Sequence, residues 1–236
     1  PSDALIADIF IHCAHDNDPL NINKKFEDDI NYQALKIIQK SIRKKNDYEI
    51  YFISSQSSNK NSKSYYGKLK YQMELLLDRQ KKNRIETIIR PGMVYDNKNS
   101  YIAELIKKIS KFKIFPFFSF KKNIQPIHIN DFNECIYKIL SKDKNFKLRE
   151  YNLATDHQIN IREFVKFICK DNKLKFPFFI YIPYFLVRFF CKLVNILGLT
   201  KYSLLERVYG LFYLPRMRTK YHLQSINYKL KNNFFL

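Results

Sequence analysis

The segment Tyr48-Glu-Ile-Tyr-Phe-Ile53, followed by Ser54-Ser55 and then by Tyr66-Gly-Lys-Leu-Lys70, carries most of the information in this sequence. The first run is apolar and aromatic, which is typical of a buried strand. Tyr66 and Lys70 stand four positions apart, so on a helix they share one face. A lysine in that position favours the phenolate and lowers the pKa of a tyrosine. With a serine hydroxyl nearby, these groups would form a proton relay suited to oxidising an alcohol or reducing a ketone.

A tyrosine and a lysine at this spacing also occur on ordinary solvated helices, and this chain is rich in both residues. The surroundings favour the chemical interpretation. The serines close an apolar strand, Tyr66 begins the next helix, and a second apolar strand, Ile85-Glu-Thr-Ile-Ile89, follows that helix. A solvated helix face stays open as the alternative.

The apolar pattern predicts alternating strands and helices along most of the chain. Strands are predicted at 8–14, 48–53, 85–90 and 124–129, and helices at 27–45, 65–82, about 100–112, from Asn130 or Asp131 to 141, and near 160–170. The helix at 27–45 is predicted from apolar residues at helical spacing: Ile30, Ala34, Ile37, Ile38 and Ile42. The alternation indicates an α/β fold whose parallel sheet is covered by helices on both faces. After residue 155 no further strand is expected.

Several short segments, in the same order, resemble landmarks of one enzyme family. They are Ile9-Phe-Ile-His-Cys-Ala14, Asn31, Tyr51-Phe-Ile-Ser-Ser55 with Tyr66-x-x-x-Lys70, Arg90-Pro-Gly-Met-Val-Tyr95, Pro126-Ile-His-Ile-Asn-Asp131 and Tyr151-Asn-Leu-Ala154. Over roughly residues 3–170 the chain resembles the extended short-chain dehydrogenase/reductase family, the NAD-dependent sugar-nucleotide epimerases and dehydratases.

The resemblance implies a fold, a cofactor and a set of site residues. It implies a partial Rossmann-like NAD(P)-binding domain over 1–155 and a small, mostly helical substrate-binding region over 156–236, to which segments near 92–125 contribute. It implies Ser55, Tyr66 and Lys70 as catalytic residues and NAD or NADP as cofactor. The implied cofactor contacts are His12, Cys13, Ala14, Asn31, Ser54, Tyr66, Lys70, Pro91, Gly92, Met93 and Val94.

The sequence lacks the Gly-rich turn that holds the pyrophosphate in dinucleotide-binding folds. Its four glycines are Gly67, Gly92, Gly198 and Gly210, so none precedes residue 67. By comparison with the family, the chain begins at the fourth strand, as a fragment or as a degenerate, N-terminally truncated member. We therefore expect an unpaired apolar edge at Ile9-Phe-Ile11, which favours association, and weak binding of NAD by the chain alone.

For the reaction, the resemblance implies a nucleotide-sugar epimerase or 4-keto reductase acting in surface polysaccharide biosynthesis. Gln56 and Ser57 stand where the family's dehydratases carry an Asp-Glu pair, so dehydration is disfavoured. The alternatives are a catalytically inactive binding subunit and a basic, peripheral membrane module. By analogy with the family, a homodimer would form through the helices at 27–45 and 65–82.

The bulk composition limits the partners. The net charge of +20 is spread along the whole chain, so we expect no nucleic acid partner, whereas an anionic nucleotide sugar or an anionic lipid suits it. The four cysteines show no C-x-x-C spacing and the five histidines are scattered, which predicts reduced thiols, a cytoplasmic location and no metal site. The apolar segment 176–199 is interrupted by Pro183, Arg188 and Lys192. It is interpreted first as a core helix and second as an interfacial helix at the inner face of a membrane.

Overall fold

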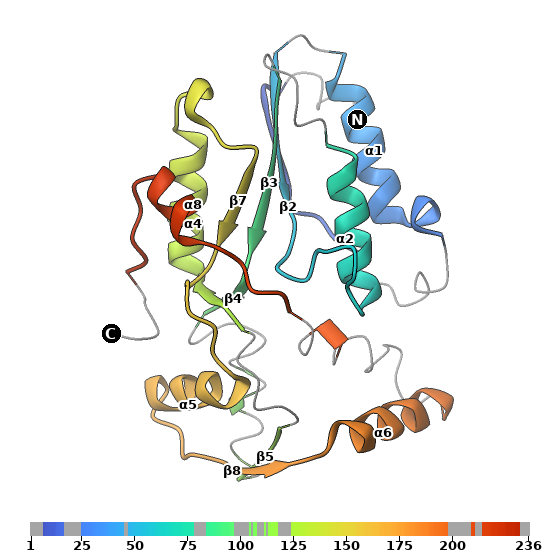
Figure 1. The fold of residues 1–236 in the computed structure, drawn as a ribbon, viewed down its shortest axis with the longest axis vertical. Helices are drawn as coiled ribbons and strands as arrows, with labels where there is room; N and C mark the ends of the chain where they lie inside the picture. The colour runs from blue at the N-terminus through green and yellow to red at the C-terminus, as the bar shows by residue number, and fades with distance from the viewer. Residues whose placement is uncertain are drawn as a thin grey trace.

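The structure is a computed structural model, and it describes residues 7–16, 25–44, 47–77, 84–96, 104, 106–107, 111, 113–117, 124–197, 209–210 and 214–231. The main sheet is parallel, with strand order β1-β2-β3-β7 (Figure 1). Its strands are β1 (Ile9–His12), β2 (Tyr48–Ile53), β3 (Arg84–Pro91) and β7 (Glu150–Leu153). The expected α/β class with a Rossmann-like parallel sheet is confirmed.

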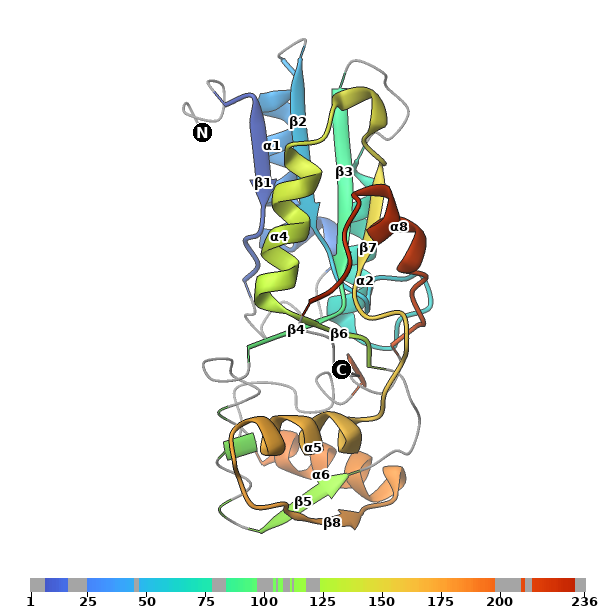
Figure 2. The same cartoon turned by 90° about the vertical axis from the view of Figure 1, so that its left-hand side faces the viewer.

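Helices cover both faces of this sheet, as the alternating pattern predicted (Figures 1 and 2). On one face lie α1 (Ile30–Ile42) and α2 (Tyr65–Leu75), preceded by the 3-10 turn η3 (Phe26–Asp28). On the other face lie α4 (Ile129–Leu140) and α8 (Lys220–Ser225). Each face has its own core, centred on Phe52 and Leu69 beneath α1 and α2, and on Tyr151 and Ile139 beneath α4.

The buried stripe of α1 differs from the predicted one. Ile30 and Ile37 are exposed, so the prediction that they face the core is wrong. The buried positions are Asn31, Leu35, Gln39 and Ile42. Gln39 is buried because its amide donates to the carbonyl oxygen of Leu76 (3.1 Å) and to the carboxylate of Glu86 (3.3 Å). Because its polar side chain is hydrogen-bonded, Gln39 can occupy a buried position on the helix. The buried side of α1 therefore includes polar residues as well as apolar ones.

β1 forms one edge of the sheet in the described part of the chain, as expected. Its side chains Ile9 and Ile11 are exposed, while His12 at its end is buried. An exposed apolar edge strand is a template for further strand pairing. That this edge promotes association stays a prediction.

Below the main sheet lie two short parallel strand pairs and two helices (Figure 2). β4 (Met93–Tyr95) pairs with β6 (Pro126–His128), and β5 (Ile114–Phe117) pairs with β8 (Phe178–Tyr181). The expectation that no strand follows residue 155 is therefore wrong. The residues of β8 are aromatic or β-branched and favour a strand once β5 offers hydrogen bonds. The helices are α5 (Ile161–Asp171), close to its predicted bounds, and α6 (Tyr184–Ile196).

α6 is not a core helix, so the first interpretation of the segment 176–199 is wrong. Only one narrow side of it is buried, through Val187 and Cys191, and most of its large apolar side chains are exposed. Among the helices that the structure describes, none combines the length and the apolar character needed to cross a bilayer.

α4 is capped by His128, whose Nδ1 accepts from the backbone N–H of Asn130 at 3.2 Å, so the prediction that Asn130 or Asp131 caps it is wrong. The ring nitrogen of His128 thus satisfies one of the N–H groups that the first turn of a helix leaves without a partner in the helix. The helix predicted at 100–112 lies mostly outside the described residues; positions 104, 106–107 and 111 are helical.

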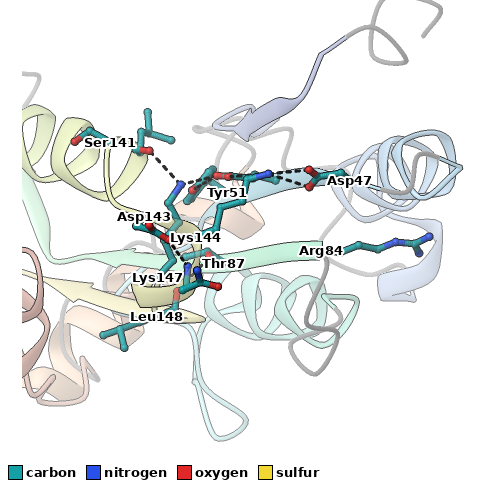
Figure 3. Close-up of polar contacts among 12 residues, drawn as sticks. Asp47, Tyr51, Arg84, Thr87, Ser141, Asp143, Lys144, Lys147 and Leu148 are labelled. Atoms are coloured by element: carbon teal, nitrogen blue, oxygen red, sulfur yellow. Dashed lines mark hydrogen bonds and ion pairs between the residues drawn. The ribbon is translucent and has the colours of Figure 1, made fainter.

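At the amino ends of the strands, a polar network fastens the loop that contains η4 (Lys144–Phe146) to the sheet (Figure 3). Lys147 Nζ donates to the Glu49 carboxylate (2.7 Å) and to the carbonyl oxygen of Leu140 (3.1 Å). The Tyr51 hydroxyl donates to the same carboxylate at 2.5 Å. These groups satisfy each other, so the network stabilises the end of the sheet opposite Ser54 and Ser55.

The division into 1–155 and 156–236 stays a prediction. Residues on the C-terminal side of that boundary do return to the main sheet, where Leu223, Ile226 and Leu230 join the core beneath α4.

Candidate functional site

Three parallel strands end at one edge of the sheet, and residues expected at the site follow each of these ends. Residues 13–16 follow β1, Ser54 and Ser55 follow β2, and Gly92 follows β3. α2 begins at the same edge, where the Ser64 side chain accepts from the backbone N–H of Gly67 at 3.1 Å. This cap fixes the first turn of α2, which carries Tyr66.

Lys70 projects from α2 toward the end of β2. Its Nζ donates to the carbonyl oxygen of Ile53 (3.1 Å) and lies 4.9 Å from the ring centroid of Phe52 and 5.9 Å from that of Tyr66. Burial lowers the pKa of Lys70 to about 8, although Glu74 and Cys13 attract its charge. The site thus contains a buried cation that loses its proton more easily than an ordinary lysine.

Tyr66 and Ser55 meet beside this cation. Tyr66 is 36% exposed, and its phenol lies close enough to the Ser55 side chain for Ser55 to act on its pKa. Ser55 Oγ also lies 3.0 Å from Ser57 Oγ. Burial raises the pKa of Tyr66, and only the Ser55 hydrogen bond acts in the opposite direction. The expectation that Lys70 lowers the pKa of Tyr66 is therefore wrong for this arrangement, because burial of the phenol sets the direction and Ser55 is the group that acts against it.

Two histidines at the end of β1 complete the surroundings of Lys70. His12 stacks on Phe52 at 5.7 Å between ring centroids, and His15 meets Tyr66 edge-on at 4.9 Å. Burial, reinforced by repulsion from Lys70, lowers the pKa of both histidines to about 4. Within the described residues, His12 Nε2 and His15 Nδ1 are buried without a hydrogen-bond partner. Two neutral imidazoles with an unused nitrogen thus face the site.

The remaining residues expected at the cofactor fall into three groups: residues exposed beside the site, residues whose side chains are hydrogen-bonded within the protein, and the turn after β3. Cys13 and Ala14 are exposed beside the site, and burial raises the pKa of the Cys13 thiol. Asn31 is used within the protein: its Oδ1 accepts from the backbone N–H of Asp16 (2.6 Å), and its Nδ2 donates to the Asp16 carbonyl oxygen (3.0 Å). Ser54 donates to the Glu74 carboxylate at 2.5 Å and belongs to the support of α2.

The third group is the turn after β3. The carbonyl oxygen of Pro91 accepts a hydrogen bond from the backbone N–H of Gln56 at 3.0 Å. Met93 and Val94 lie in β4. Gly92 packs against the segment before β6: a Cβ at this position would lie 1.9 Å from the carbonyl oxygen of Gln125. The glycine is thus required by close backbone packing within the protein.

Glu74 and His15 were not recognised from the sequence. Glu74 is buried on α2, four residues after Lys70, and binds Arg90 and Ser54. The repeat Tyr66-x-x-x-Lys70-x-x-x-Glu74 places all three residues on one helix face and could have indicated this role. No sequence signal distinguishes His15, because its contact with Tyr66 depends on the path of the chain after β1.

The donor set fits one half of a dinucleotide. A buried ammonium, a tyrosine hydroxyl and a serine hydroxyl suit a ribose and a reacting carbonyl or alcohol, and the unused His12 and His15 nitrogens suit further polar atoms. The sequence offers no Gly-rich turn for a pyrophosphate. The residues therefore fit the nicotinamide–ribose end of a cofactor.

Comparison with known proteins supports this architecture. No protein-family model and no curated protein matches the chain. A nucleoside-diphosphate-sugar epimerase from Staphylococcus aureus matches with a TM-score of 0.68 and 13% identity, over 98% of this chain and 77% of that one. A dTDP-4-dehydrorhamnose reductase from Bacillus anthracis, in complex with NADP, matches with a TM-score of 0.57 and 14% identity, over 95% and 81%. A monomeric L-threonine 3-dehydrogenase from a metagenome matches with a TM-score of 0.67 and 15% identity, over 96% and 74%.

The chain has the fold of these sugar-nucleotide epimerases and reductases. The resemblance noted from the sequence motifs is confirmed at this level. At these identities the match concerns the fold, because one fold serves many activities.

Proposed function

We propose that this chain carries the catalytic half of an NAD(P)-dependent enzyme that oxidises or reduces a hydroxyl-bearing carbon of a nucleotide sugar, as a 4-epimerase or a 4-keto reductase. The observation that carries the proposal is the meeting of Ser55, Tyr66 and Lys70 at the carboxyl edge of a parallel sheet. In open α/β sheets this edge is where ligands bind.

Tyr66 is the proton donor and acceptor of the proposed reaction. Its raised pKa keeps the phenol protonated at neutral pH, so the resting site is ready to protonate a ketone oxygen. Ser55 bonds the phenol and is placed to bond the same substrate oxygen, which orients the proton for transfer. When bound, NAD or NADP would supply the hydride to the carbon of this ketone, or accept it from the corresponding alcohol carbon.

Lys70 has two tasks in this proposal. Its ammonium lies over the Tyr66 ring, 5.9 Å from the centroid, and this cation–π contact holds the ring beside the strand end. It also offers donors to a ribose hydroxyl at the strand end. Because its pKa is about 8, the amine gives up and regains a proton near neutral pH and can reload Tyr66.

Gln56 and Ser57, the two residues after Ser55, limit the types of reaction that the proposed site can catalyse. Gln56 carries an amide, which donates to the carbonyl oxygen of Pro215 at 2.9 Å, and Ser57 carries a hydroxyl, which contacts Ser55. Neither position therefore supplies a carboxyl group for loss of water. This supports an epimerase or reductase over a dehydratase. We place the enzyme in surface polysaccharide biosynthesis on the strength of the resemblance, and the basic chain suits an anionic diphosphate.

The experiment is a turnover assay with a panel of nucleotide sugars and 4-keto nucleotide sugars, in which NAD(P)H absorbance and product isomers are followed. Tyr66→Phe should lower turnover at least about 100-fold, which is the usual size of general acid–base assistance. Tyr65→Phe is the matched control, because that neighbouring hydroxyl donates to Asp29 at 3.0 Å and packs outside the relay. Equal losses in both variants, or turnover retained in Tyr66→Phe, would exclude the assignment.

A second candidate function is a binding subunit without turnover, favoured by the lack of a Gly-rich turn in the sequence. It predicts that nucleotide sugar binds, detected by calorimetry, while no panel member is converted at any NAD(P) concentration. Binding that is lost in Lys70→Met but unchanged in Tyr66→Phe would favour it.

A homodimer through α1 and α2 belongs to the same proposal. The exposed Ile30 and Ile37 on α1 and Leu75 on α2 support it. Light scattering should then report a dimer that Ile37→Glu converts to a monomer.

A further inference from the structure

β8 and α6, which follow each other in the chain, both expose large apolar side chains to solvent. We call it the aromatic face and define it by Phe178, Phe185, Phe189, Phe190, Leu193 and Ile196, which expose between 42% and 81% of their surface. α6 continues directly from β8 along the lower border of the molecule (Figure 1). Large apolar side chains that gather on one exposed surface mark a docking site far more often than scattered ones do.

The arrangement of side chains around α6 is that of a helix lying in an interface. Val187 and Cys191, one turn apart, face the protein and are buried. The aromatic face occupies the opposite side of the helix. Arg188 and Lys192, both exposed and also one turn apart, lie along one border of the aromatic face. Cations beside an exposed apolar stripe are characteristic of helices in the headgroup region of a membrane.

The chain segment that carries the aromatic face has charges of one sign. Between residues 172 and 197 the sequence contains no Asp or Glu and carries Lys173, Lys175, Arg188 and Lys192. The chain as a whole has a net charge of +20. This surface therefore complements an apolar phase bordered by negative charge, which is what the surface of an anionic bilayer offers.

A second copy of the chain fits this surface poorly. A two-fold interface brings the same patch of both copies together, so Arg188 and Lys192 would meet their own counterparts without an acidic residue of this segment to pair with. Like charges in that position oppose association, whereas phosphate headgroups would neutralise them.

We propose that β8 and α6 dock the protein on an anionic lipid bilayer, with α6 parallel to the membrane and the aromatic face in the boundary between headgroups and acyl chains. Arg188 and Lys192 extend their charged ends to lipid phosphates. This inference does not rest on the proposed enzymatic activity.

The test is co-sedimentation of the whole chain with large vesicles of phosphatidylcholine containing phosphatidylglycerol, and with phosphatidylcholine alone. The chain should bind the anionic vesicles and lose binding in high salt. The triple variant Phe185→Ser, Phe189→Ser, Phe190→Ser should partition at least about tenfold more weakly, since three large apolar contacts are removed. Arg188→Gln with Lys192→Gln should reduce the preference for anionic vesicles by roughly tenfold.

The matched control replaces exposed aromatic residues elsewhere. Tyr137 and Phe146 are 69% and 68% exposed on α4 and η4, outside the aromatic face. Tyr137→Ser with Phe146→Ser should bind vesicles as the parent does, and circular dichroism should show that all variants are folded. Three results would overturn the proposal: no sedimentation with anionic vesicles at low salt, equal binding by the triple and control variants, or a lipid-free oligomer that the triple variant abolishes.

Discussion

Removing the charge of Glu74 should destabilise the fold more than any other single carboxylate change near the site. Glu74 is buried on α2, and its carboxylate accepts from Arg90 Nε (2.7 Å), Arg90 Nη2 (2.5 Å) and Ser54 Oγ (2.5 Å). It also attracts Lys70 and so holds the pKa of that buried amine up. One carboxylate thus compensates two buried cations and joins α2 to the ends of β2 and β3.

Glu74→Gln preserves the shape of the side chain and removes the charge. Its amide oxygen can accept at most two of the three hydrogen bonds, its NH2 group cannot accept the third, and the Arg90 side chain, only 18% exposed, loses its bidentate partner. Removing one member of a buried ion pair costs about 3–5 kcal/mol, which is a large part of the 5–15 kcal/mol that stabilises a typical domain. We expect a loss of about 3 kcal/mol in the free energy of unfolding.

The measurement is equilibrium urea denaturation followed by far-ultraviolet circular dichroism, because the chain has no tryptophan to serve as a fluorescent probe. Glu150→Gln is the matched control. That residue binds the same Arg90, but its side chain is 32% exposed against 2% for Glu74, so the loss should be about 1 kcal/mol or less. A Glu74→Gln variant within about 1 kcal/mol of the parent, or less affected than Glu150→Gln, would refute the reasoning.

Two further predictions concern the strand ends. His12 is 4% exposed and has a folded-state pKa of about 4, against 6.5 in the unfolded chain, so the unfolded state takes up its proton first as the pH falls. The stability that His12 contributes should be fully present above pH 6.5 and decline toward pH 4, with a loss of about 2 kcal/mol by pH 5. Urea denaturation at both ends of this range should show that the stability of His12→Gln depends less on pH than that of the parent. Parallel pH profiles for the two proteins would contradict the shift in pKa. Gly92→Ala should lower the free energy of unfolding by about 1–3 kcal/mol, because the added Cβ would overpack against Gln125. Gly210→Ala is the control: its Cβ would meet nothing within 4 Å, so the melting temperature should be nearly unchanged. Similar melting temperatures for both variants would show that the turn at Gly92 can relax.

The parts of the fold that follow from local sequence were predictable. The run 48–53 is apolar or aromatic except at Glu49 because the strand is buried on both faces, and its predicted bounds agree with β2. The prediction for α1 was wrong in its facing residues, because the buried Gln39 is satisfied by Leu76 and Glu86, which come from distant parts of the chain. β8 was missed for a similar reason: its strand state depends on β5, more than sixty residues earlier.

The candidate site was predictable where one helix face and one strand end define it. The spacing of Tyr66 and Lys70, and the position of Ser55 after an apolar strand, gave the three residues that the structure brings together. The electrostatics were not predictable from spacing. Burial decides the pKa of Tyr66 and of Lys70, and burial depends on tertiary packing.

The two cores of the main sheet are completed at different times during synthesis. All fully buried members of the core beneath α1 and α2 lie between Leu35 and Ile88, whereas the core beneath α4 includes Leu223, Ile226 and Leu230. A ribosome extends the chain from its amino end, so one side of the sheet can consolidate while the other still waits for its last apolar residues. Until then Tyr51 and Ile89 have an incomplete cover, and the nascent chain is a natural client for chaperones that shield apolar strands.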